Sequence, residues 1–145
     1  MWIISPAPQS MKTQPWYDDG LCFECKLCGN CCSGIPGHVW ITDEEIESIA
    51  GHLEIEETDF RKHYVVNVRG KGTSLVERQN SDCVFFNSNY GCVIYDHRPL
   101  QCRTWPFWKG IVETQKTWVD TATTCPGIGQ GNKFSAEDIT VLIKW

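Results

Sequence analysis

The sequence predicts an α+β fold with a small antiparallel sheet, two or three short helices and long metal-binding cysteine loops. Three observations predict it: a capped amphipathic helix pattern, two glycine-bounded runs of strand-forming residues, and cysteines in segments without periodicity. The length of 145 residues suits one domain that can bury a core without disulfide bonds. We expect an extended arm over residues 1–20 and a single cysteine-cluster domain over residues 21–145.

The amino-terminal part of the chain is predicted to be extended and then to enter the cysteine loop. Residues 1–20 are proline-rich and polar, and we expect Trp2 or Trp16 to pack against the domain. Residues 22–37 form the cysteine loop, which ends in Gly-Ile-Pro-Gly, a strong turn signal.

Three helices are predicted from their caps. Thr42 and Glu45 match the capping box, so a helix begins at Thr42. A second helix runs from Thr58 towards Tyr64, and Ser135 caps a last helix. The first helix has one apolar face, made by Ile46, Ile49, Ala50 and Leu53.

Two hairpins are predicted between these helices. In the first, residues 64–69 pair with residues 74–79 across a glycine-containing turn. In the second, residues 83–86 pair with residues 92–95. Two further expectations complete the order of elements: an irregular segment over residues 97–108 and a strand over residues 116–121.

The cysteine loop is the feature that points most directly to chemistry. A Cys-x-x-Cys turn lets two sulfurs face one ion, and both zinc sites and iron–sulfur clusters use it. One such pair can also form a redox disulfide, but three successive two-residue gaps extend beyond a single redox pair. Five cysteines fall within eleven residues: Cys22, Cys25, Cys28, Cys31 and Cys32.

A disulfide framework is the alternative to metal binding, and three observations disfavour it. The chain has nine cysteines, so one thiol would be left over. Cys31 and Cys32 are neighbours that do not pair easily with each other. The first residues lack the basic start and apolar core of a secretory signal. We therefore expect a cytoplasmic protein, where clustered cysteines serve metal binding or catalysis.

Four more cysteines extend the set. Cys83 and Cys92 bracket the second predicted hairpin, so strand pairing would bring their sulfurs near each other. Cys102 lies between two arginines, and Cys125 is followed by proline. A Cys-Pro step also ends the cysteine run of bacterial ferredoxins.

Together these segments resemble a known family. FECKLCGNCC, then DCVFFNSNYGCVIYDHRPLQCRTWPF, then a late cysteine are similar to the YkgJ-type cysteine-cluster proteins, a zinc- or iron-chelating family with the CxxCxxCC signature. The resemblance extends over residues 23–126 and leaves Cys22 outside the chelating set. It implies these metal ligands: Cys25, Cys28, Cys31, Cys32, Cys83, Cys92, Cys102 and Cys125.

Other side chains are candidates for supporting roles. Arg98 and Arg103 can offset thiolate charge and donate hydrogen bonds to sulfur, or they can be ordinary surface arginines. His97 is a ligand candidate, although it is more typical of a loop residue. Two further sets are expected: Trp105, Phe107 and Trp108 as shields against water, and His38, His52 and His63 as structural or exposed histidines.

Composition and motifs limit the function. The net charge is −5 and the pI about 5.3, so a basic nucleic-acid surface is absent, and the short apolar runs predict no membrane span. The sequence contains no recognisable nucleophile–base pair or phosphate-binding loop, so it does not decide whether the protein is an enzyme.

We expect an iron–sulfur cluster with a redox, sensing or oxidoreductase-accessory role and a protein redox or assembly partner. The alternatives are a non-catalytic module holding one or two zinc ions and a metal-handling protein.

Overall fold

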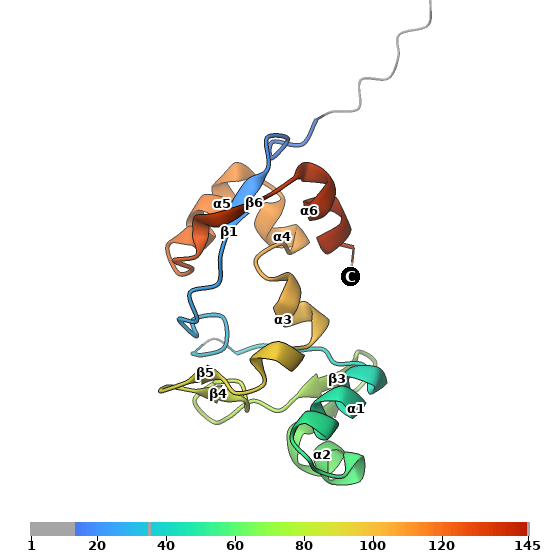
Figure 1. Cartoon of the computed structure of the whole chain (residues 1–145). Helices are drawn as coiled ribbons and strands as arrows, with labels where there is room; N and C mark the ends of the chain where they lie inside the picture. Colours follow the sequence, from blue (N-terminus) through green and yellow to red (C-terminus); the bar gives the residue numbers. More distant parts are fainter. Residues whose placement is uncertain (1–13, 35, 145) are drawn as a thin grey trace, which may run out of the picture.

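The computed structural model describes residues 14–34 and 36–144, and its class is the predicted α+β (Figure 1). The described strands form three separate two-stranded antiparallel sheets, β1–β6, β2–β3 and β4–β5. The strands are β1 (Leu21–Phe23), β2 (Val65–Val68), β3 (Gly72–Leu75), β4 (Phe86–Asn87), β5 (Gly91–Cys92) and β6 (Ile128–Phe134). The helices are α1 (Asp43–His52), α2 (Glu57–Tyr64), the 3₁₀ turn η1 (Tyr95–His97), α3 (Leu100–Thr104), α4 (Lys109–Val112), α5 (Gln115–Ala122) and α6 (Ala136–Leu142).

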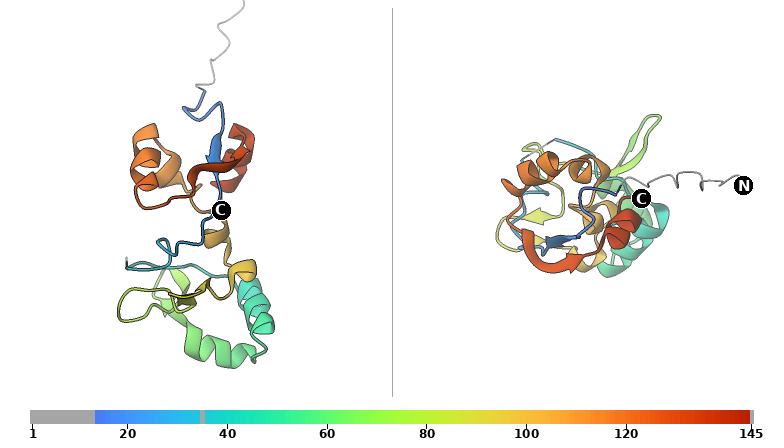
Figure 2. Two further views of the ribbon diagram at one scale, coloured as in Figure 1. Left: turned by 60° about the vertical axis from the view of Figure 1, so that its left-hand side comes forward. Right: turned by 90° about the horizontal axis from the view of Figure 1, so that it is seen from above.

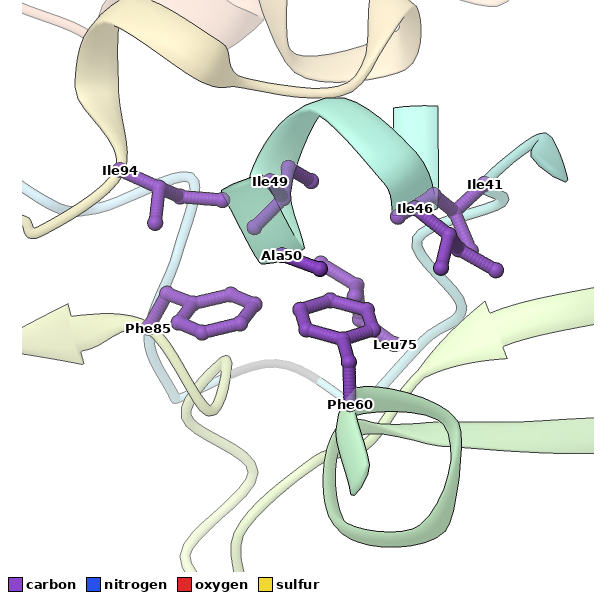
Figure 3. Packing of buried hydrophobic residues seen from close by; sticks show 8 residues of the cluster. All are labelled: Ile41, Ile46, Ile49, Ala50, Phe60, Leu75, Phe85 and Ile94. Carbon is purple, nitrogen blue, oxygen red and sulfur yellow. The ribbon is translucent and has the colours of Figure 1, made fainter. Parts of the chain in front are cut away.

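A first hydrophobic core lies between α1, α2 and the β2–β3 hairpin. The helix α1 begins as predicted, with Thr42 and Glu45 forming a reciprocal capping box. Its apolar face packs on Phe60 of α2, which is completely buried. Figure 3 shows the eight side chains of this core converging from both helices, β3 and the second hairpin: Ile41, Ile46, Ile49, Ala50, Phe60, Leu75, Phe85 and Ile94.

A second hydrophobic core lies between the β1–β6 sheet and the helices α4, α5 and α6. Its centre is made by Phe107, Val112, Trp118 and Ile139. Trp16 joins this core, because its indole N–H donates to the carbonyl oxygen of Val112 at 2.7 Å. Residues 1–13 of the predicted arm lie outside the described residues, and residues 15–20 form a turn.

The two cores are separated along the long dimension of the molecule, and the cysteine loop and α3 run between them. Figure 1 places β1, β6 and α4–α6 at one end and α1, α2 and the first two hairpins at the other, and Figure 2 shows the same separation from a second direction. Among the described residues, no helix is long and apolar enough to cross a bilayer. The cysteine loop beyond β1 and the helix α3 carry five of the nine cysteines, so these five lie between the two cores.

The structure corrects two sequence predictions. The segment 116–121 was predicted to be a strand, but it lies within α5. Thr114 and Thr117 form a reciprocal cap at its start, and helical spacing buries Trp118 in the second core, which outweighs the strand preference of the threonines and valine. The segment 97–108, predicted to be irregular, contains α3.

The β1–β6 sheet was not predicted. Strand β6 contains two glycines in its seven residues, which weakens any strand signal. The pairing joins the two ends of the described chain, with Leu21 opposite Phe134. The other two hairpins are present as predicted, but their strands, 65–68 with 72–75 and 86–87 with 91–92, differ in bounds from the predicted ranges. The Ser135-capped last helix agrees with the sequence prediction.

Candidate metal centre

The described part of the predicted cysteine loop that follows β1, residues 24–34, is fixed to both halves of the molecule by hydrogen bonds. At its start, the Glu24 N–H donates to the Gly127 carbonyl oxygen at 3.1 Å. In its middle, the Asn30 amide donates to the Thr124 carbonyl oxygen at 2.7 Å. Near its end, the Cys32 carbonyl accepts from the Cys83 N–H at 2.8 Å. The loop thus links the segment around Cys125 to the second hairpin.

Two glycines allow backbone and side chains to approach this loop closely. Gly29 has φ +75°, and a Cβ there would stand 2.2 Å from the ring of Phe86. A Cβ on Gly127 would stand 2.0 Å from the Glu24 carbonyl oxygen. Real Cβ contacts are essentially never this short. The loop therefore follows this path because these two positions carry no side chain.

The other four cysteines reach the loop from separate elements. Cys83 precedes β4, and Cys92 lies in β5 on the opposite strand of the same hairpin. Cys102 is in α3, the short helix between the two cores. Cys125 follows α5 and is the most buried cysteine, with 7% of its surface exposed.

Eight cysteines line two adjoining cavities of about 250 Å³ and about 60 Å³. Of these two cavities, Cys28 and Cys125 line only the larger, and Cys83 and Cys92 line only the smaller; Cys83 also lines a third cavity with Cys31 and Cys32. The remaining four line both cavities: Cys25, Cys31, Cys32 and Cys102. These eight are the residues that the family resemblance implied, although their role as ligands stays a prediction. Cys22, which pairs with Lys133 across the β1–β6 sheet, lines neither cavity.

The thiols surround the cavities without converging on one point. Among the described residues, no three histidine, cysteine, aspartate or glutamate side chains stand close enough to hold a single ion. The Cys31 and Cys32 sulfurs are 3.8 Å apart. The donor set itself fits zinc or an iron–sulfur cluster, since soft thiolates select these metals over magnesium or calcium.

Burial and neighbouring thiols shift the pKa values of five of the cavity cysteines. Burial raises the pKa of the Cys102 thiol to about 12, and nearby Cys83 adds to this shift. Burial also raises the pKa of Cys83 and of Cys92. A hydrogen bond from the Cys32 thiol lowers the pKa of Cys31 to about 7, and the same bond raises the pKa of Cys32. The raised pKa values keep the thiols of Cys32, Cys83, Cys92 and Cys102 protonated without metal, so a metal must displace their protons.

The predicted supporting arginines lie in different surroundings. Arg98 lines the smaller cavity, where its guanidinium carbon stands 3.8 Å above the ring centroid of Tyr95. Arg103 lines neither cavity, because its side chain donates to the Arg98 carbonyl oxygen at 3.0 Å and lies 3.8 Å from Glu45. A hydrogen bond with Cys25 raises the pKa of Tyr95, so this tyrosine is also in contact with the cysteine loop.

Aromatic side chains form one wall of the larger cavity. Trp105 and Trp108 line it, with ring centroids 4.8 Å apart in an edge-to-face arrangement. Phe107 lies instead in the second hydrophobic core. Phe23 lines both cavities and contacts Phe107 at 6.0 Å between centroids, so the cavity wall is continuous with this core.

Sequence reasoning missed one cavity residue with ligand chemistry. His38 lines the larger cavity, although the sequence analysis expected it to be structural or exposed. His97, the histidine considered as a ligand, instead stacks on His52 with 4.2 Å between ring centroids. The position of His38 six residues after Cys32 was the available signal.

A known protein family matches the segment that carries these cysteines. The model of the CxxCxxCC family, described as "Putative zinc- or iron-chelating domain", matches residues 24–126. The chain belongs to the CxxCxxCC family. The match includes the eight cavity cysteines and begins after Cys22. Membership of the CxxCxxCC family supports metal binding by the cysteine cluster and leaves the choice of metal open.

A curated relative matches part of the chain. The uncharacterized protein MJ0661 of Methanocaldococcus jannaschii is 33% identical over 92 residues, which cover 63% of this chain and 48% of the relative. The chain therefore matches about half the length of this relative. No solved structure matches the chain.

Proposed function

We propose that the protein holds an iron–sulfur cluster in the two adjoining cavities and transfers single electrons to or from a protein partner in the cytoplasm. The observation that carries this proposal is the sharing of thiols, since four of the eight cysteines line both cavities. Two independent zinc sites with four thiolates each need four ligands that they do not share. Each cavity has only two cysteines that do not also line the other cavity, so the eight thiols suit one larger group that they surround together.

The spread of the thiols supports the same proposal. No three donors among the described residues converge on a single point, whereas a cluster of several irons takes its thiolates from positions around its own volume. The larger cavity, about 250 Å³, leaves room for a polynuclear group.

The surroundings of the cavities suit redox chemistry. Trp105 and Trp108 restrict water on one side, and burial of a cluster tunes its reduction potential. Cys28 and Cys31 are exposed, which gives a partner protein a short path to the cluster. Nine free cysteines suit a reducing compartment, and the cytoplasm is part of the proposal for this reason.

The first experiment is anaerobic purification, followed by measurement of iron, acid-labile sulfide and zinc. We expect a brown protein with iron and sulfide in equal amounts and a reversible one-electron transition by electron paramagnetic resonance. A colourless protein with stoichiometric zinc and no redox transition would overturn the proposal.

A pair of variants tests the shared pool directly. Cys125→Ser removes a thiol that lines only the larger cavity, and Cys92→Ser removes one that lines only the smaller cavity. If the protein held two separate zinc sites, each variant would lose about half of the bound metal and would keep the other half. One shared cluster predicts that either substitution lowers iron and sulfide together, without a stable half-loaded form.

A zinc-stabilised interaction module is the second candidate, and one observation favours it. The cysteine loop and α3 lie between two separate hydrophobic cores, as Figure 1 shows. Closed thiolate sites that join distant segments contribute directly to folding. Zinc in the anaerobically purified protein, with no iron, would favour this candidate.

A further inference from the structure

We infer that His38 is a nitrogen ligand of the metal centre in the larger cavity, so that the centre has mixed nitrogen and sulfur ligation. The inference rests on the proposed metal centre and concerns which side chains bind it. Among the described residues that line the two cavities, His38 is the one imidazole, and no carboxylate lines either cavity. It is therefore the strongest non-thiol ligand available to a metal there.

The backbone around His38 is fixed next to Cys102. The Gln101 side chain donates to the His38 carbonyl oxygen at 2.9 Å and accepts from the Trp40 N–H at 2.8 Å. The Val39 N–H donates to the Ser74 hydroxyl oxygen at 3.1 Å. These bonds hold the segment between α3 and β3, so residue 38 has a defined position at the cavity.

The imidazole ring is oriented, and it has no polar partner among the described residues. It packs on the Trp40 ring with 4.9 Å between centroids and 36° between planes. Neither ring nitrogen of His38 makes a hydrogen bond to any residue in the described ranges 14–34 and 36–144. An imidazole nitrogen without a hydrogen-bond partner is available to bind a metal.

The other three histidines are engaged elsewhere. His52 and His97 stack on each other, and the His97 Nδ1 lies 3.3 Å from the Ser48 hydroxyl oxygen. The His63 Nδ1 lies 2.9 Å from the Asp59 carbonyl oxygen, within α2. None of the three lines either cavity, so they serve as matched controls for His38.

A histidine ligand would change the properties of the centre. Imidazole is neutral where thiolate is negative, so each replacement of thiolate by imidazole makes the centre less negative by one charge. In iron–sulfur clusters, histidine ligation in place of cysteine raises the reduction potential. His38 is exposed and lines the larger cavity, so, like the exposed Cys28 and Cys31, it would be a ligand within reach of an incoming partner or proton.

X-ray absorption spectroscopy at the edge of the bound metal tests this inference with either iron or zinc. We expect the wild-type protein to show outer-shell scattering from imidazole ring carbons, which water and thiolate ligands do not give. The signal should be lost in His38→Ala and retained in His52→Ala, His63→Ala and His97→Ala. If His38→Ala loses its metal altogether, retention of the signal in all three control variants still assigns it to His38.

Three results separate the possible failures. An all-sulfur spectrum in the metal-loaded wild-type protein overturns the inference and leaves the proposed metal centre intact. An imidazole signal that disappears in one of the control variants also overturns it, because the ligand is then another histidine. A wild-type protein that binds neither iron nor zinc overturns the proposed function itself.

Discussion

Gly127 contacts another backbone segment so closely that a single methyl group should disrupt the metal centre. An added Cβ would stand 2.0 Å from the Glu24 carbonyl oxygen and 2.9 Å from its carbonyl carbon. Ordinary contact begins at 3.4 Å, so Gly127→Ala must separate the two segments by about 1.4 Å, the difference between 3.4 and 2.0 Å. Glu24 directly precedes Cys25, and Gly127 lies two residues after Cys125.

This displacement is large on the scale of metal–ligand bonds. Ligand distances in metal sites hold within about 0.2 Å, so a shift of about 1.4 Å moves Cys25 and Cys125 out of range of a shared centre. The hydrogen bond from the Glu24 N–H to Gly127 would also break. Its loss costs about 1 kcal/mol, and the overpacking adds about 1–3 kcal/mol.

The assay compares bound metal per chain and thermal melting after anaerobic purification. We expect Gly127→Ala to lose most of its metal and to melt at a lower temperature. Gly110→Ala is the matched control, because its added Cβ meets no atom within 4 Å and α4 tolerates alanine. Wild-type metal content and melting in Gly127→Ala would refute the reasoning.

Three further predictions concern the cysteines and the metal. Cys28→Ser should reduce bound metal much more than Cys22→Ser, because Cys22 lines neither cavity. Measurement of the metal content of both variants tests this prediction, and a larger loss in Cys22→Ser would exclude our ligand set. Anaerobic chelation should lower the melting temperature markedly, since the cysteine loop links segments that belong to two cores; an unchanged melt after verified metal removal would contradict this. The metal-free protein should lose stability as the pH rises from 9 towards about 12, because the folded state favours the neutral Cys102 thiol. Urea unfolding across this range, compared with Cys102→Ala, measures that loss, and identical pH profiles would count against it.

Local signals predicted the elements that local interactions define. Thr42 and Ser135 cap helices as their sequence patterns indicated, because a capping box needs only residues three apart. The same device at Thr114 was missed, since its partner is threonine instead of the glutamate or glutamine that the usual pattern contains. Helix α5 was therefore mistaken for a strand.

Long-range contacts were less accessible from the sequence. The β1–β6 pairing depends on register between residues more than 100 positions apart, such as Leu21 and Phe134, and glycines conceal the second strand. The family pattern indicated which eight cysteines belong together, but not that four of them line both cavities. His38 was overlooked because its role depends on Gln101 holding its backbone beside α3.

The pairing of β1 with β6 also has a consequence for the time course of biosynthesis. Cys25 leaves the ribosome 100 residues before Cys125, and at about 5–20 residues per second this delay lasts about 5–20 s. During that interval β1 has no partner strand and the earliest thiols have no carboxy-terminal counterpart. Metal delivered during that interval would meet an incomplete donor set, so loading of the full centre must follow the synthesis of Cys125, and the early thiols need a reducing environment until β6 has been made.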